Sequence, residues 1–304
     1  MAERLIEAAE APAHPAWRLG NLLDVRPRSV FLAGHAVGAH NLPLASPTGP
    51  AQAGSDPELD LERRIPSVLL PPRHEPLLVF AERAELALRV RDFLRGRGRP
   101  LADACVLEEQ ARGDPPAQWA VGGPGANSLW RAPEFLVAHA GLLPAPALGP
   151  VLDLGAGAGR AAVWLAARGW RVTAIDRLPE ALALAARLAV GHDLGVGRLT
   201  LLRRDLRAPG AVPRGPWAAI LAFRYLDREL CARAPGLLMP GGIVIMRTFG
   251  PGDGHRRPCS PRHRLAGGEW LRLFPDPPFE ILVHVEDHDP DGRPAAGVVA
   301  RLRP

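Results

Sequence analysis

Lysine is absent from this 304-residue sequence, so all 37 of its basic side chains (apart from histidine) are arginines. The arginines are scattered along the chain, which favours a solvated surface over the basic stripe of a nucleic-acid-binding protein. Tyrosine occurs once, and aromatic residues make up only 5% of the chain. No run of about 18 uncharged apolar residues is present, so we expect no membrane-spanning helix.

Cysteine is scarce as well. Its three copies, Cys105, Cys231 and Cys259, lie far apart and form no CxxC pair. This argues against a disulfide framework and is typical of a reducing compartment. Residues 1–15 lack the long apolar core of a secretory signal, and we therefore expect a cytoplasmic protein. The length and the 47% hydrophobic content are sufficient for two globular domains.

The first part of the chain predicts a small α/β domain over residues 1–110. Short apolar runs indicate strands at residues 21–26 and 77–81, with a further short strand among the glycine turns of residues 29–44. Helical spacing covers residues 82–98 and ends at a glycine. Residues 111–127 combine dense proline and glycine with no periodicity, and we interpret them as a linker.

The second part, residues 128–304, predicts a doubly wound, mostly parallel Rossmann-like sheet. Residues 133–143 favour a first helix. The expected strands lie at residues 150–154, 170–176, 198–206, 217–223, 241–249, 279–287 and 296–303, and the expected helices at residues 160–168, 178–190 and 228–239. A sheet of this kind binds its ligands at the carboxyl ends of its strands.

The strongest motif is "DLGAGAGR", which lies between an expected strand and an expected helix. Gly155, Gly157 and Gly159 allow the backbone to turn tightly and a ligand to approach without a Cβ in the way. A dinucleotide-binding fingerprint requires glycine at position 160, and Arg160 stands there instead. The spacing is therefore GxGxG, which departs from the pattern for nicotinamide cofactors.

The stretch "VLDLGAGAGRAAVWLAARGWRVTAIDR" closely resembles the first motif of class I S-adenosylmethionine-dependent methyltransferases. "RRDLRAP" and "LLMPGGIVIMRTF" are similar to two later motifs of that family. The resemblance implies that S-adenosylmethionine is the cofactor, with Asp176 on the ribose hydroxyls and Asp205 and Leu206 on the adenine. A carboxylate suits this role because its two oxygens can accept from a vicinal diol. The cofactor-binding residues implied are Asp153, Gly155, Ala156, Gly157, Gly159, Asp176, Arg177, Asp205, Leu206 and Ala222.

The segments "AAILAFRYLDREL", "HRLAGGEWLRLF" and "FEILVHVED" resemble small-molecule methyltransferases of the tellurite-resistance type. They are most similar to proteins in which such a domain follows a rhodanese-like one. In the first 110 residues, "LLDVR" and "AGHAVGAHNLPL" resemble the rhodanese signature. That family presents a cysteine in a loop patterned CxxGxR, and the matching positions here are Ala81, Ala84 and Leu86. We therefore expect a rhodanese-like domain without sulfurtransferase activity, because persulfide chemistry requires a thiol.

Several residues remain open between a substrate-binding and a structural role. Arg224 and Tyr225 follow an expected strand and could face the acceptor, although Arg224 could equally make a surface ion pair. Asp227 fits a helix N-cap better than a general base. In "HRRPCSPRH", Pro258 and Pro261 disfavour a zinc-binding helix, and a mobile loop whose His255, Arg256 or Arg257 contact substrate is the better interpretation.

Other assignments concern packing. Asp153 could lie near the methionyl amine of the cofactor or serve only as a cap. Trp130 and Phe135 fit a packed helix stripe better than a pocket wall, and Cys105 fits a buried hydrophobic position. No metal site is expected.

The sequence thus predicts direct methyl transfer to a small acceptor, thiol-like or chalcogen-like by the resemblance. The rhodanese-like domain would dock substrate or a partner protein. The alternatives are an RNA or protein methyltransferase and a non-catalytic S-adenosylmethionine-binding scaffold.

Overall fold

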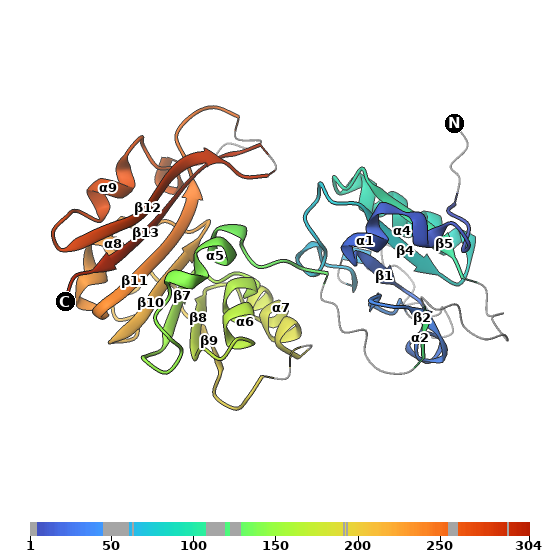
Figure 1. The fold of residues 1–304 in the computed structure, drawn as a ribbon, viewed down its shortest axis with the longest axis horizontal. Coiled ribbons are helices and arrows are strands. Elements are labelled where there is room, and N and C mark those ends of the chain that lie inside the picture. The colour runs from blue at the N-terminus through green and yellow to red at the C-terminus, as the bar shows by residue number, and fades with distance from the viewer. Residues whose placement is uncertain are drawn as a thin grey trace. The chain divides into compact units, whose positions relative to one another are not determined.

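The structure is a computed structural model, which describes residues 5–44, 61–62, 64–107, 119–121, 129–190, 192, 194–254, 261–290 and 292–304. The chain divides into two compact units, Met1–Arg131 and Ala132–Pro304. Both units are α/β structures and are drawn in Figure 1. Among the described residues, no helix has the length and apolar character needed to cross a membrane.

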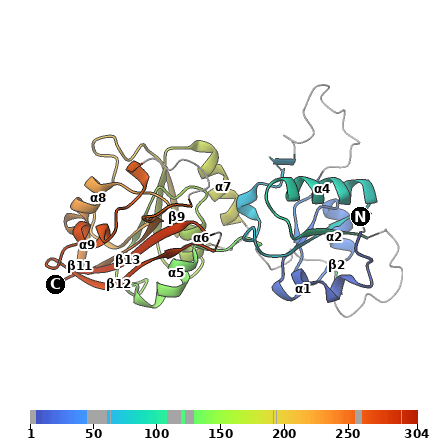
Figure 2. The same cartoon turned by 90° about the horizontal axis from the view of Figure 1, so that it is seen from above.

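The first unit is built on a four-stranded parallel sheet in the order β3-β1-β4-β5. Its strands are β1 (Leu22–Asp24), β3 (His40–Asn41), β4 (Leu77–Ala81) and β5 (Ala102–Val106). Its helices are η1 (Ala11–Ala13), α1 (Pro15–Leu19), α2 (Arg28–Ala33), η2 (Ser67–Leu69) and α4 (Ala84–Gly96). Figure 2 shows α4 on one face of this sheet and α1 on the other. Alternate residues of each strand supply the two apolar layers, as expected for a sheet that is covered on both faces.

Two features of this unit were not foreseen. Helix α2 occupies residues for which the sequence suggested only turns and a short strand. It forms because Phe31 is fully buried against the sheet. The free energy of this packing outweighs the weak helix preference of a short segment that ends at a glycine. Within the expected linker, β6 (Trp119–Ala120) pairs with β2 (His35–Ala36), and the Trp119 ring contacts that of Phe80.

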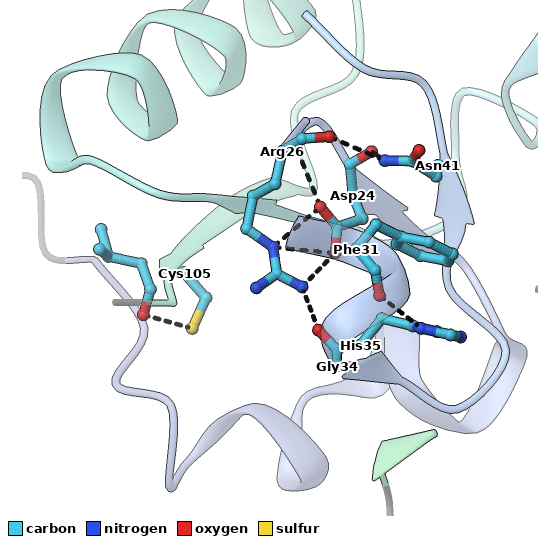
Figure 3. A network of polar contacts seen from close by, with 8 residues as sticks. Asp24, Arg26, Phe31, Gly34, His35, Asn41 and Cys105 are labelled. Atoms are coloured by element: carbon cyan, nitrogen blue, oxygen red, sulfur yellow. Dashed lines mark hydrogen bonds and ion pairs between the residues drawn. The ribbon is translucent and has the colours of Figure 1, made fainter. Parts of the chain in front are cut away.

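A buried ion pair organises the end of β1 (Figure 3). Asp24 and Arg26 are both almost inaccessible to solvent, and the guanidinium donates to the carboxylate at 2.7 and 3.1 Å and to the Gly34 carbonyl at 2.8 Å. The side-chain amide of Asn41 donates to the carbonyls of Asp24 and Arg26. These hydrogen bonds give the buried polar groups their partners and hold the chain that follows β1 in place.

The second unit carries a seven-stranded sheet in the order β12-β13-β11-β10-β7-β8-β9. Its strands are β7 (Val151–Leu154), β8 (Val172–Asp176), β9 (Leu199–Arg203), β10 (Trp217–Phe223), β11 (Leu238–Phe249), β12 (Phe279–His288) and β13 (Pro294–Leu302). The four neighbouring pairs β9–β8, β8–β7, β7–β10 and β10–β11 are parallel. Strand β13 runs antiparallel to both β11 and β12. The α/β character and the Rossmann-like sheet expected from the sequence are confirmed.

Helices cover both faces of this sheet. They are α5 (Glu134–His139), η3 (Ala140–Leu142), α6 (Arg160–Ala166), α7 (Pro179–Val190), α8 (Arg228–Arg233), η4 (Ala234–Gly236), η5 (Pro261–His263) and α9 (Glu269–Leu273). One apolar layer combines α5 and α6 with alternate residues such as Val151, Leu221 and Ile245. The opposite layer combines α8 and α9 with the intervening residues Ile220 and Met246. Because alternate residues of each strand point to opposite faces and both faces are covered, the central strands are buried.

The prediction of a helix over residues 228–239 was wrong for the second half of that range. Helix α8 ends at Arg233, a short 3-10 turn follows, and β11 begins at Leu238. The cause is long-range pairing: Leu238 lies opposite Trp217 of β10, and the register shifts before the regular ladder continues. Strand pairing across the sheet therefore overrides local helical spacing.

Candidate functional site

The loop between β7 and α6 forms the centre of the candidate site. Gly155, Gly157 and Gly159 have φ angles of 63°, 54° and 72°, in the left-handed region that other residues rarely adopt. The Ala156 amide donates to the carbonyl of Ile175 on β8, which ties the loop to the neighbouring strand. The loop thus lies at the carboxyl edge of the sheet, where this fold binds ligands.

The three glycines serve different purposes. A Cβ at Gly155 would lie 2.7 Å from the Tyr225 ring, and one at Gly159 would lie 2.6 Å from the Cβ of Ala185 on α7. These two positions permit close packing within the protein. A Cβ at Gly157 would meet nothing within 4 Å. Gly157 therefore lines open space, the arrangement expected where a ligand approaches the backbone.

Asp176 ends β8 beside this space. Its Oδ2 accepts from the Gly157 amide at 2.8 Å, and its Oδ1 accepts from the Leu178 amide at 2.9 Å. The carboxylate is partly exposed and keeps capacity for further donors. Asp205 follows the next strand, β9, and accepts from the Arg207 amide, while Leu206 is buried and Arg177 is exposed. The residues expected from the sequence for ribose and adenine thus follow adjacent strands.

Asp153 lies on β7 beneath the glycine loop and is 2% exposed. No described residue hydrogen-bonds its Oδ2 atom, which is an uncommon state for a buried carboxylate. Burial raises the pKa of Asp153 to about 7; the Ala162 amide opposes this rise, and the negative charge of Asp176 adds to it. Ala162 lies in the first turn of α6, so Asp153 contacts the start of that helix, and its Oδ2 atom has no partner among the described residues.

The raised pKa of Asp153 predicts a pH-dependent stability of the ligand-free protein. An unfolded aspartate has a pKa near ~3.9, so between about pH 4 and pH 7 the folded state holds a proton that the unfolded state has lost. The free energy of unfolding should therefore fall with rising pH across this window, by at most about 1.4 kcal/mol per pH unit from this group, and level off above it. Asp153→Asn should lack this contribution. Denaturant titrations of both proteins across the window measure it, and parallel curves would contradict the assignment.

Arg224, Tyr225 and Asp227 follow β10 at the same edge. Asp227 caps α8 by accepting from the Leu230 amide at 3.1 Å, which confirms the expected N-cap. The Tyr225 hydroxyl donates to Asp227, and burial together with this carboxylate raises the tyrosine pKa far above its usual value. Arg224 makes the alternative surface contact, an ion pair with Asp289 at 3.5 Å. Tyr225 therefore serves as a wall against Gly155 and is poorly suited as a base.

Sequence reasoning missed the roles of two arginines at this edge. Arg160 begins α6 directly after the glycine loop, and burial together with the positive charge of Arg224 lowers its pKa. Arg247 on β11 donates to Asp289 at 3.1 Å and to Asp287 at 2.7 Å. Arg160 was noticed only as the residue that breaks the dinucleotide pattern. The pairing of β7 with β10 places the segments that carry Arg160 and Arg224 at the same edge of the sheet, which local spacing does not reveal.

A cavity of about 400 Å³ lies beyond β11, among α8, α9 and the described ends of the segment that connects β11 to α9. Its polar lining includes Arg228, Asp253, Arg264 and Glu269. Arg228 and Glu269 form an ion pair. The Arg228 guanidinium donates a hydrogen bond to the Glu269 carboxylate and thereby lowers the pKa of Glu269. The candidate residues His255 and Arg257 and the cysteine of "HRRPCSPRH" lie outside the described residues.

The remaining expectations concern packing and metals. Phe135 is buried and its ring fills the space next to Gly297, and Trp130 is buried in the first unit. Ala222 is buried at the end of β10. Within the part of the chain that the structure describes, no group of three or more histidine, cysteine or acidic side chains could hold a metal ion.

Comparison with known proteins identifies this unit. Residues 151–242 match the family described as a methyltransferase domain. Two curated ubiquinone biosynthesis O-methyltransferases are similar over 104 residues, one from Caulobacter vibrioides at 32% identity and one from Caulobacter sp. (strain K31) at 30%. Each alignment covers 33% of this chain and 40% of the relative, so the match spans well under half of the relatives' length.

Solved structures are similar to the second unit as well. TehB from Haemophilus influenzae has 20% identity and a TM-score of 0.45, covering 56% of this chain and 62% of that one. A methyltransferase from Methanosarcina mazei has 20% identity and a TM-score of 0.41, covering 51% and 92%. The match over residues 151–242 includes the glycine loop, Asp176 and Asp205. The match thus places a methyltransferase domain in the second unit, over residues 151–242.

Proposed function

We propose that the protein is an S-adenosylmethionine-dependent methyltransferase that acts on a small, nucleophilic or anionic acceptor. The observation that carries this proposal is the open space at Gly157, bordered by the Asp176 carboxylate, in the loop that follows the strand of the buried Asp153. These groups suit the cofactor, because a carboxylate can accept from a vicinal diol and an unpartnered buried oxygen favours a cationic group.

The residue roles follow from the order of the strands. Asp176 would hold the ribose hydroxyls, and Asp205 with the backbone of Leu206 would contact the adenine, because they follow the adjacent strands β8 and β9. The glycine loop, with Ala156, would admit the methionyl part. Arg177 would flank the nucleoside, and Ala222 would close the floor of the site at the end of β10.

The protein contributes mainly position and a dry surface to the reaction. S-adenosylmethionine, when bound, supplies a methyl group on a sulfonium leaving group, so the acceptor's electron pair forms the new bond and the carbon–sulfur pair stays on sulfur. Leu154, Ala222 and Met246 lie side by side on three neighbouring strands and are at most 3% exposed. This apolar floor excludes water and favours alignment of the reacting atoms.

Three described side chains that follow β10, those of Tyr225, Asp227 and Cys231, are poorly suited as general bases. Tyr225 has a raised pKa and Asp227 is engaged in capping α8. Cys231 is buried, and burial raises its pKa to about 12. An acceptor that reaches the site already ionised, such as a thiolate, selenolate or chalcogen oxyanion, is therefore favoured over an alcohol.

Calorimetric titration with S-adenosylmethionine and S-adenosylhomocysteine tests the cofactor site. Transfer of a labelled methyl group to thiols, selenite, tellurite or RNA then tests the activity and its acceptor class. Binding in the micromolar range with turnover on a small acceptor is expected. Turnover on RNA alone would favour a nucleic-acid enzyme, binding without any turnover a scaffold, and absence of binding would overturn the proposal.

We further propose that the first unit is a rhodanese-like domain without sulfur-transfer activity. In support, β4 ends at Ala81, where that family carries its nucleophile, and α4 follows at once. Cys105 lies on the next strand, but it is buried, and burial raises its pKa to about 11. On this proposal the domain spans residues 1–110, a linker covers residues 111–127, and the domain docks substrate or a partner protein.

This second proposal predicts no sulfur transfer from thiosulfate to cyanide, with an active rhodanese as the positive control. The physical reason is that a neutral, buried thiol presents no thiolate to a sulfur donor. Turnover that Cys105→Ala abolishes would contradict the prediction. Turnover that survives this substitution would point to another group in the chain and would contradict it equally.

A further inference from the structure

The strand order separates two sides of the candidate site. Asp176 and Asp205 follow β8 and β9, whereas β10, β11 and β13 lie on the other side of the glycine loop. On the proposed function, on which this inference rests, the nucleoside occupies the first side. The methyl acceptor must then approach over the second side, because it attacks the sulfonium from the direction opposite to the leaving group.

Two arginines follow the neighbouring strands β7 and β10 at the boundary of the second side. Arg160 follows the loop after β7, and Arg224 is the first residue after β10, whose Ala222 is paired with Leu154. Arg224 continues the ladder by donating its amide to the Arg247 carbonyl at 2.8 Å. Tyr225, the residue after Arg224, packs its ring against Gly155, so the end of β10 meets the loop that leads to Arg160. The positive charge of Arg224 also lowers the pKa of Arg160.

Neither charge is fully compensated within the described part of the chain. Arg160 has no carboxylate partner there, although it is partly buried. Arg224 reaches Asp289 only at 3.5 Å and its side chain remains 56% exposed. Asp289 is bound more closely by Arg247, at 3.1 Å, and Asp287 also pairs with Arg247.

The backbone of Arg224 supports a functional role as well. Its φ of 58° is the single left-handed value among the described residues that are not glycine. This conformation costs about 1 kcal/mol or more for a residue with a Cβ, and such strain concentrates at binding sites. This backbone conformation keeps Arg224 at the carboxyl edge of the sheet, while the next residue, Tyr225, packs against Gly155.

We propose that Arg224 and Arg160 form a subsite for a fixed negative charge, a carboxylate or similar oxyanion, that the acceptor carries in addition to its nucleophilic atom. Two guanidinium groups bind such a group strongly because each donates charge-assisted hydrogen bonds. The subsite would select anionic acceptors over neutral ones of the same size. Arg247 would act only as a positioning residue, since it anchors Asp289 beside Arg224.

The observations favour the acceptor over the cofactor's own carboxylate as the source of this charge. Arg224 is tied to Asp289, which follows β12, and to the backbone of β11, both on the acceptor side of the loop. A group held there lies beyond the end of β10, away from β8 and β9. The cofactor's carboxylate is nevertheless a competing source of the same chemistry, and the experiment must distinguish the two.

The test uses the full-length protein saturated with S-adenosylhomocysteine. It is titrated with 3-mercaptopropionate and with its neutral isostere 3-mercaptopropionamide, followed by ligand-observed NMR. The protein should bind the carboxylate at least about tenfold more tightly than the amide. Arg224→Gln and Arg160→Gln should each reduce this preference to about twofold or less while leaving affinity for S-adenosylhomocysteine within about twofold. Arg187→Gln, an exposed arginine in the last turn of α7, is the matched control and should change neither quantity.

The other outcomes overturn the inference in distinguishable ways. If the protein binds S-adenosylhomocysteine but does not prefer the carboxylate, the inference fails and the proposed function stands. If either glutamine variant loses affinity for S-adenosylhomocysteine but not for 5′-methylthioadenosine, which lacks the amino-acid part, the arginine binds the cofactor's carboxylate instead. If the unsubstituted protein does not bind S-adenosylhomocysteine, the proposed function fails and this inference with it.

Discussion

Gly157→Ala should weaken binding of S-adenosylhomocysteine by about 30- to 100-fold while leaving the domain folded. The added methyl group would meet no protein atom within 4 Å, so it would project into the space assigned to the cofactor. Filling a closely fitted site with an extra carbon typically costs about 1–3 kcal/mol and occasionally more. Calorimetric titration measures the affinity, and thermal unfolding measures the stability.

Gly197→Ala provides a control that is matched in conformation. Gly197 has a φ of 74°, and a Cβ there would also meet nothing within 4 Å, but it lies before β9, at the opposite edge of the sheet from the glycine loop. Both alanine variants should lose about 1 kcal/mol of stability from the left-handed backbone. Their melting temperatures should therefore agree within a few degrees, and only Gly157→Ala should lose affinity. Equal affinities would show that the open space at Gly157 is not the cofactor site.

Gly155→Ala and Gly159→Ala would be less informative as tests of binding. Their added Cβ atoms would collide with Tyr225 and with Ala185, respectively, so each would disturb the packing of the domain before any ligand is present. Of the three glycines in the motif, Gly157 is therefore the one whose substitution separates cofactor binding from folding.

Much of this site could be predicted from local sequence. The glycine spacing, the acidic residue that ends the next strand and the N-cap at Asp227 are each set by residues within a few positions of that feature. Each depends on a short-range requirement: left-handed backbone, a carboxylate at a strand end, or an acceptor for free helix amides. The structure places Gly157 in hydrogen-bond contact with Asp176, nineteen residues away, because β7 and β8 are parallel neighbours.

The parts that local sequence could not predict depend on long-range pairing. Helix α8 ends early because Leu238 joins β11, and α2 forms because Phe31 fits beneath the first sheet. The relation between Arg160 and Arg224 has the same origin, since it requires β7 and β10 to be adjacent although 64 positions separate the two arginines. Strand order decides these contacts, and hydrophobic periodicity alone does not specify strand order.

Asp176→Ala should produce the largest loss of cofactor affinity, about 100-fold or more. Each hydrogen bond from a ligand hydroxyl to a charged acceptor contributes about 1.5–3 kcal/mol, and the carboxylate would accept from two hydroxyls. The substitution also removes the acceptor of the Gly157 and Leu178 amides, so part of the loss would come from a less ordered loop.

Asp176→Asn separates these two contributions. The amide keeps one oxygen that can accept from a backbone N–H, but it loses the charge and one acceptor. If the carboxylate binds the ribose directly, the asparagine variant should still lose about tenfold or more in affinity, because only one hydroxyl retains an acceptor. If Asp176 only orders the loop, the oxygen that asparagine retains still accepts from one of the Gly157 and Leu178 amides, and the loss of affinity should be no more than a few-fold, which would contradict the assignment to the ribose.

Asp276→Ala supplies the control for removal of an aspartate elsewhere in the same domain. Its carboxylate pairs with Arg303, and both side chains are about half exposed, so the pair contributes little to stability. Affinity for S-adenosylhomocysteine should be unchanged in this variant. The decisive comparison is then among three proteins that differ by one side chain, in which affinity falls in the order Asp276→Ala, Asp176→Asn, Asp176→Ala. Equal affinities of Asp276→Ala and Asp176→Asn would reassign Asp176 to a structural role.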